Sequence, residues 1–91
     1  MRIKIHFRKN LKMSPEKLAS QCGHVAKEIG RMMASNARAD KIIVLGVSDS
    51  KYRKLCEEFQ REGILWYEQV DSGLTEVIAG TSTAFGYVEE M

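Results

Sequence analysis

One amphipathic segment, which begins at Ser14, restricts the fold of this chain more than any other feature. Ser14 is a favourable helix N-cap and Pro15 suits the first helical turn, so the pattern predicts a helix over residues 15–34. Its apolar side chains recur every three or four positions and form one stripe: Leu18, Cys22, Val25, Ala26 and Ile29. One face of this helix must therefore pack on a core.

The rest of the chain alternates strand-like and helix-like patterns. Residues 2–8 alternate apolar and polar side chains, which indicates a strand with one apolar face or a buried strand with polar ends. The continuous apolar run at 42–45 predicts a central, buried strand. Ser48 caps a second amphipathic helix over 49–62, which Gly63 ends and whose core stripe is Tyr52, Leu55, Cys56 and Phe59.

The remaining pieces complete the order of elements. Residues 35–40 are expected to form a short helical or turn-like connector, and 71–73 a turn. Strands are predicted at 64–70 and 82–88, with a short extended piece at 76–79. Helical crossovers favour parallel pairing, and the last two strands can pair antiparallel. We therefore predict one domain over 1–91, an α/β three-layer sandwich whose mixed sheet of about four strands is flanked by helices.

Composition excludes several classes of protein. The chain is 44% hydrophobic and 29% charged, as in ordinary globular proteins, and it lacks the ~18–20 consecutive apolar residues of a membrane span. Cys22 and Cys56 are too far apart for a zinc knuckle, and we expect reduced thiols in a cytoplasmic protein. We predict neither a metal site nor a cofactor.

The charge is divided unevenly along the sequence. Residues 1–41 hold ten Lys/Arg and three Asp/Glu, whereas 42–91 hold four Lys/Arg and nine Asp/Glu. A basic half can attract a polyanion, and Arg8, Lys9 and Lys12 gather just before the first helix. A dipolar surface without function is the alternative.

Two segments far apart in the sequence carry most of the polar chemistry. Lys17, Gln21 and His24 follow one another at spacings of four and three, so they share a ridge beside the apolar stripe of the helix. The stretch 71–83 supplies a carboxylate from Asp71, two glycines and several hydroxyls. If the fold joins these segments, the result is a polar site without a metal.

The same two segments resemble the signatures of the type II peptidyl-tRNA hydrolase family. Positions that match the first signature are Arg8, Lys9, Leu11, Lys12, Met13, Lys17, Gln21, Cys22 and His24. Positions that match the second are Asp71, Gly73, Thr75, Gly80, Thr81 and Thr83. The two signatures stand in the family's order, and the resemblance spans nearly the whole chain.

The resemblance implies hydrolysis of the ester that joins a peptide to tRNA. It assigns activity to Lys17, Asp71, Thr75 and Thr83, with Gln21, His24, Gly80 and Thr81 beside the site or on the substrate. The basic side chains of Arg8, Lys9 and Lys12 would meet the RNA. The expected partner is tRNA, no membrane is involved, and a homodimer is a further expectation.

Departures from the family pattern keep other functions open. They occur at Asn10, Glu16, Leu74, Glu76 and Ala79. Leu74 and Glu76 make the second signature less basic, so a catalytically impaired RNA- or protein-binding module on the same fold is the main alternative. A cysteine hydrolase built on Cys22 and His24 is a weaker one, because residues two apart on a helix point in different directions.

Overall fold

The computed structural model describes residues 1–33, 37–62, 65–73 and 80–89 of the chain. Their elements are β1 (Arg2–Arg8), η1 (Lys9–Leu11), α1 (Pro15–Met32), β2 (Lys41–Val47), α2 (Asp49–Glu62), β3 (Trp66–Val70) and β4 (Ser82–Glu89). The short 3-10 helix η1 was not predicted; the other elements match predicted segments. The predicted helix stop at 63 and extended piece at 76–79 lie outside the described residues, and the described part of the connector, 37–40, is not helical.

The four strands form one mixed sheet in the order β2-β1-β4-β3. β1 pairs parallel with β2 across the α1 crossover, and β4 pairs antiparallel with both β1 and β3. The predicted parallel pairing and antiparallel final pair are both confirmed.

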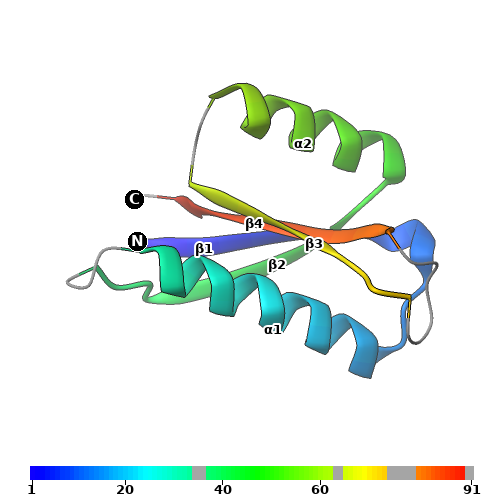
Figure 1. The fold of residues 1–91 in the computed structure, drawn as a ribbon, viewed down its shortest axis with the longest axis horizontal. Coiled ribbons are helices and arrows are strands. Elements are labelled where there is room, and N and C mark those ends of the chain that lie inside the picture. Colours follow the sequence, from blue (N-terminus) through cyan, green and yellow to red (C-terminus); the bar gives the residue numbers. More distant parts are fainter. Residues whose placement is uncertain (34–36, 63–64, 74–79, 90–91) are drawn as a thin grey trace.

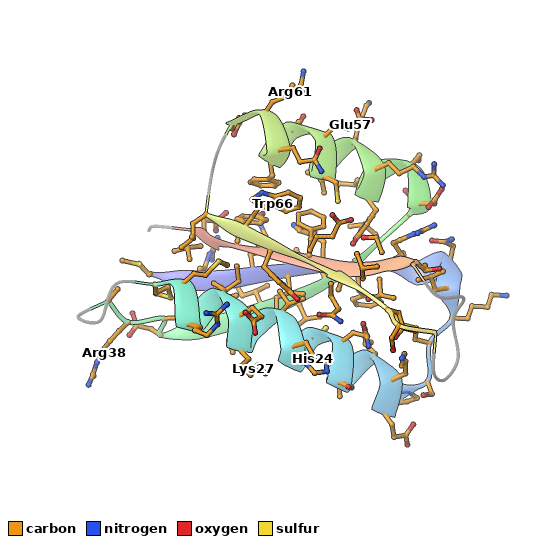
Figure 2. All side chains as sticks on the ribbon, viewed as in Figure 1. His24, Lys27, Arg38, Glu57, Arg61 and Trp66 are labelled. Atoms are coloured by element: carbon orange, nitrogen blue, oxygen red, sulfur yellow. The ribbon has the colours of Figure 1, made fainter. Side chains whose placement is uncertain are left out.

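The two helices cover opposite faces of the sheet, which gives the predicted three layers (Figure 1). Under α1 lies a core of Ile3, Ile5, Val25, Ile29 and Ala84, and under α2 lies a core of Val47, Tyr52, Phe85 and Tyr87. Trp66 packs against the second core between β3 and α2 (Figure 2). β1 and β4 are therefore the buried central strands.

The prediction that residues 42–45 form a central buried strand is wrong. β2 is an edge strand, and three of its apolar side chains are strongly exposed: Ile42 (57%), Val44 (42%) and Leu45 (40%). α1 packs on β1, β3 and β4, whereas α2 packs on β1 and on the aromatic side chains of β4. An apolar run shows that a strand could be covered on both faces, but not that other elements reach it.

The start of each helix follows the sequence closely. The Ser14 hydroxyl accepts a hydrogen bond from the Lys17 amide at 3.1 Å, which caps α1. Ser48 does the same for α2, accepting from the Lys51 amide at 3.3 Å. α1 ends at Met32, two residues before the predicted end. No helix in the described part of the chain is long and apolar enough to span a membrane.

Candidate active site

The two polar segments meet at one end of the sheet. There β3 ends, β4 begins and α1 starts (Figure 1). Lys17, in the first turn of α1, and Asp71, just after β3, are 54 positions apart, yet Lys17 Nζ lies 2.5 Å from Asp71 Oδ1. Both side chains are largely buried, with 11% of Lys17 and 4% of Asp71 exposed. The sequence pattern anticipated this pair, but only the fold brings it together.

The backbone around Asp71 fixes its carboxylate. The Asp71 amide donates to the Thr81 carbonyl at 2.9 Å, and the Gly80 amide donates to the Asp71 carbonyl at 2.8 Å. The Gly73 amide donates to Asp71 Oδ2 at 2.7 Å. Gly73 and Gly80 have φ values of 82° and 84°, which glycine adopts without strain. Both described ends of the 71–81 segment are therefore tied to this one residue.

Gln21 and Thr83 extend the pair into a chain of buried hydrogen bonds. Gln21 Nε2 lies 3.4 Å from Asp71 Oδ1, and the Thr83 hydroxyl donates to Gln21 Oε1 at 2.7 Å. Gln21 is 3% exposed and Thr83 is fully buried. A buried amide and hydroxyl in an otherwise apolar layer need such partners, and their bonds fix the orientation of each side chain.

A β-bulge turns Thr83 toward this network. β3 and β4 pair Gln69 with Ala84 and Val70 with Ser82, so Thr83 is the extra residue of β4. Ser82 bonds the Tyr52 hydroxyl on the α2 side, while Thr83 and Ala84 both face α1. Without the bulge, strand alternation would separate Thr83 and Ala84 onto opposite faces. No pattern in the sequence indicates this bulge.

The surroundings of Asp71 favour its charged form. The hydrogen bond from Lys17 and then that from the Gly73 amide lower the pKa of Asp71 below its usual value. Asp71 is thus a carboxylate at neutral pH and a weak base, better suited to holding the Lys17 ammonium than to abstracting a proton. The ammonium lies beside the first turn of α1, and the start of a helix also favours a negative charge nearby.

Comparison with known proteins identifies the family of the chain. The family model described as peptidyl-tRNA hydrolase PTH2 matches residues 1–88. The chain belongs to the PTH2 peptidyl-tRNA hydrolase family. A probable peptidyl-tRNA hydrolase 2 from Caenorhabditis elegans is 29% identical in an alignment that covers 90% of this chain and 31% of that protein. The chain therefore spans about a third of the length of this curated relative.

The PTH2 signature residues are not all in the same surroundings. Lys17, Asp71, Gln21 and Thr83 share one network, with the Thr81 and Gly80 backbone beside it. The predicted catalytic residue Thr75, like the departures at 74, 76 and 79, lies outside the described residues. His24 is exposed on α1 (Figure 2), and no hydrogen bond joins it to the network in the described part of the chain.

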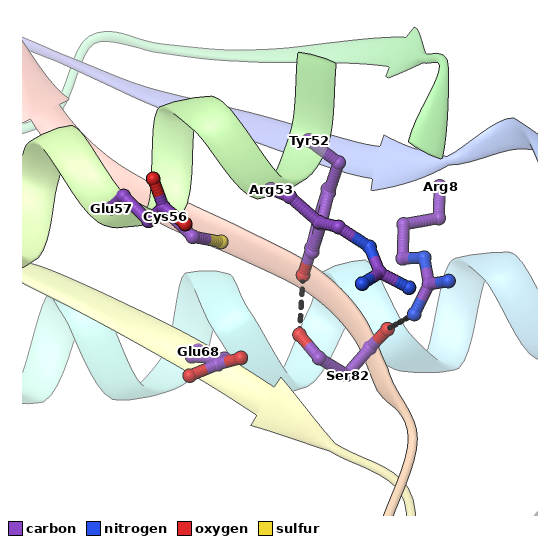
Figure 3. Close-up of a pocket in the computed structure, with 7 residues that line it drawn as sticks. All are labelled: Arg8, Tyr52, Arg53, Cys56, Glu57, Glu68 and Ser82. Carbon is purple, nitrogen blue, oxygen red and sulfur yellow. Dashed lines mark hydrogen bonds between the residues drawn. The ribbon is translucent and has the colours of Figure 1, made fainter. Parts of the chain in front are cut away.

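The predicted basic cluster divides between the two faces of the sheet. The Arg8 guanidinium turns to the α2 side, where it bonds Asp49 Oδ1 at 2.5 Å and the Ser82 carbonyl at 3.1 Å. It lies in a pocket of about 310 Å³ whose other lining residues are Tyr52, Arg53, Cys56, Glu57, Glu68 and Ser82 (Figure 3). With two cations and two carboxylates, this lining has no strong preference for an anion.

Lys9 and Lys12 remain on the side of the network. Both side chains are exposed, and they border a second pocket of about 280 Å³ between η1 and the start of α1. Phe7, Met13 and Leu18 contribute apolar atoms to this pocket, beside Arg8. An apolar floor with a cationic rim suits a nucleotide, and these three apolar residues were not singled out in the sequence as site residues.

Neither thiol is arranged for catalysis. Burial raises the pKa of Cys22 and raises that of Cys56 to about 11, so both remain protonated and weakly nucleophilic at neutral pH. The two cysteines are free. The described residues contain no group of three or more His, Cys, Asp or Glu side chains that could hold a metal ion.

Proposed function

We propose that this chain hydrolyses the ester bond between peptide and tRNA in peptidyl-tRNA, releasing free tRNA and peptide. The observation that carries the proposal is the buried Lys17–Asp71–Gln21–Thr83 network in a chain of the PTH2 family. The name of the Caenorhabditis elegans relative points the same way. Translation supplies this substrate in the cytoplasm, which is where we expect the chain to act.

Lys17 is the group we assign to the reacting ester. An ammonium has three donors, and Asp71 is the partner that Nζ contacts among the described residues. Another N–H can point to the ester carbonyl oxygen and stabilise the negative charge that develops as water attacks. The carbon–oxygen bond to the ribose then breaks, and the sugar oxygen leaves as a hydroxyl with a proton that originates in the water.

The other network residues position Lys17. Asp71 holds the ammonium through its charge, and Gln21 fixes the same carboxylate oxygen from the second turn of α1. Thr83 sets the orientation of the Gln21 amide. Such a prearranged donor spends little energy on reorganisation during the reaction. By their signature positions, we assign Thr75 to the reaction and Gly80, Thr81 and His24 to the substrate side.

Lys9 and Lys12 are the residues we assign to the RNA. They lie exposed around the pocket between η1 and α1, close in sequence to Lys17. Phosphates bound there would bring the acceptor end of tRNA alongside the start of the helix. Arg8, already paired with Asp49, contributes less of its charge to this surface.

The deciding experiment is cleavage of an N-blocked aminoacyl-tRNA by the purified chain at neutral pH, with and without a chelator. We expect release of tRNA that chelation does not change. Binding of tRNA without cleavage by folded protein would instead support the RNA-binding module. The absence of both binding and cleavage would contradict both functions.

A further inference from the structure

Ser82 links the two faces of the sheet beside the candidate active site. It is the first residue of β4, and its neighbour Thr83 belongs to the buried network on the α1 side. Its own hydroxyl lies on the α2 side, where it bonds Tyr52. The two residues share a planar peptide bond, so a contact that fixes the backbone of one restricts the direction of the other. The proposed function uses Thr83 but gives no role to the contacts of Ser82.

Two side chains from different elements hold Ser82 on the α2 side (Figure 3). The Tyr52 hydroxyl, from α2, lies 2.7 Å from the Ser82 hydroxyl. The Arg8 guanidinium, from the end of β1, donates to the Ser82 carbonyl at 3.1 Å. Both the side chain and the backbone oxygen of this residue are therefore fixed, at the point where a bulge interrupts the pairing of β3 and β4.

The two holding side chains are themselves fixed. Tyr52 is 3% exposed, and its ring meets that of Phe85 edge-on with 5.1 Å between the centroids. Burial raises the pKa of Tyr52, so its hydroxyl keeps its proton at neutral pH. Arg8 bonds Asp49 at 2.5 Å, and its guanidinium carbon lies 5.7 Å from the centroid of the Tyr52 ring. Arg8 and Tyr52 thus form one rigid unit.

The Thr83 hydroxyl has a choice of acceptor that depends on such a unit. It lies 2.7 Å from Gln21 Oε1 and 3.3 Å from the Gln69 carbonyl, but a hydroxyl has one proton to donate. Only the bond to Gln21 orients the amide that faces Asp71. A small rotation of the β4 backbone would favour the Gln69 carbonyl instead and release the Gln21 amide.

We infer that Tyr52 is a positioning residue for the reaction. Together with Arg8 it holds Ser82 from the α2 side, and the neighbouring Thr83 is thereby kept directed at Gln21 on the α1 side. Because the network lies across the sheet, Tyr52 acts without contact with the ester. Its effect on cleavage rests on the proposed function, whereas its effect on the orientation of Gln21 does not.

Cleavage of an N-blocked aminoacyl-tRNA by Tyr52→Phe tests the effect on the reaction, because this change removes the hydroxyl and keeps the ring. We expect kcat to fall about three- to tenfold, the scale of one lost hydrogen bond, with KM near that of the wild type. Ser82→Ala should have the same effect, since it removes the other half of the contact. The double variant should be no slower than either single variant.

Tyr87→Phe is the matched control. Tyr87 belongs to the same core as Tyr52 and is 8% exposed. Its hydroxyl bonds His6 Nε2 at 3.2 Å, farther along β4 from the bulge. Tyr87→Phe therefore removes a buried tyrosine hydroxyl from the same layer without touching Ser82, and kcat should stay near that of the wild type.

The side-chain amide signals of Gln21 in a heteronuclear NMR spectrum test the same contact without cleavage. They are assigned as the pair that Gln21→Glu removes. We expect them to shift in Tyr52→Phe and in Ser82→Ala, because the Thr83 hydroxyl leaves Gln21 Oε1. They should keep their positions in Tyr87→Phe.

Three results would overturn the inference: Gln21 signals that keep their positions in Tyr52→Phe, a kcat that this variant retains although the wild type cleaves, or a double variant whose loss in kcat is the product of the two single losses. Circular dichroism checks that each variant is folded. A wild type that does not cleave would contradict the proposed function, and the NMR spectra would still decide whether Tyr52 orients Gln21.

Discussion

Lys17 differs from an ordinary helix lysine because its ammonium lies against the buried Asp71 carboxylate. We predict that Lys17→Ala lowers kcat at least ~10²-fold, the scale of a lost donor to an oxyanion. It should also lower the melting temperature, because Asp71 loses its charged partner. Lys17→Arg should recover more stability than activity. Single-turnover cleavage below the melting temperature is the measurement, with exposed Lys27→Ala on the same helix as control. Unchanged turnover in Lys17→Ala would assign the lysine to structure alone.

Asp71 makes stability depend on pH at the acid end. Its pKa is lowered in the folded state, by the Lys17 hydrogen bond first, relative to an ordinary value of 3.8. Its contribution to the free energy of unfolding is therefore complete above that value and is lost as pH falls through the folded pKa. We predict that urea unfolding of the wild type loses more stability between neutral pH and about pH 3 than Asp71→Asn does. Parallel curves for the two proteins would contradict the ion pair.

Single residues also show how much of the candidate site can be predicted from the sequence. Lys17, Gln21 and Asp71 were identified as candidates because their spacing and chemistry are visible in the sequence. The sequence grouped His24 with them, but three residues after Gln21 the helix has turned toward solvent. The contact between Thr83 and Gln21 depends on a bulge that alternation alone does not reveal. The spacing of residues along the sequence predicts which face of a helix they share. The register of the strands in the fold decides which partner each side chain contacts.

At the scale of elements, two similar caps have different consequences. Ser14 and Ser48 each accept one amide hydrogen bond at a helix start. Replacing either with alanine should cost about 1 kcal/mol. Ser14→Ala should also reduce cleavage, because the amide that it caps is that of Lys17, whereas Ser48→Ala should leave cleavage unchanged. Urea unfolding and cleavage rates for both variants are the measurements, and equal activity in the two would show that the cap does not position the lysine.

The helices and strands were predicted well, but the order of the strands in the sheet was predicted less well. Helix starts follow local signals such as Ser14-Pro15, and the parallel β1–β2 pair follows from the crossover helix. The place of β2 at the edge depends on where β4 inserts, which is a long-range property. An apolar run of the same composition can be buried by neighbouring elements or by a second chain, and sequence periodicity does not distinguish these cases.

In the folded molecule, the basic and acidic residues are separated less completely than they are along the sequence. Lys9 and Lys12 keep exposed charges near the network, but Arg8 is paired with Asp49, and α2 carries a further exposed pair, Lys51 and Lys54. The latter pair borders an open hollow of about 370 Å³ with Ser50. Net charge therefore does not identify the RNA surface, and the position of each lysine relative to Lys17 has to decide it.

The two exposed lysine pairs can be compared by mutation. Lys9→Ala with Lys12→Ala should weaken tRNA binding and reduce the slope of log affinity against log salt by about one to two, because each lost phosphate contact releases about one fewer counterion. Lys51→Ala with Lys54→Ala removes the same charge from positions on α2 that are also exposed, and should leave the slope near that of the wild type. Fluorescence titrations of uncharged tRNA at several salt concentrations measure both. If the α2 pair lowered the slope and the η1 pair did not, tRNA would approach across α2, and the substrate could not reach Lys17 along the path we propose.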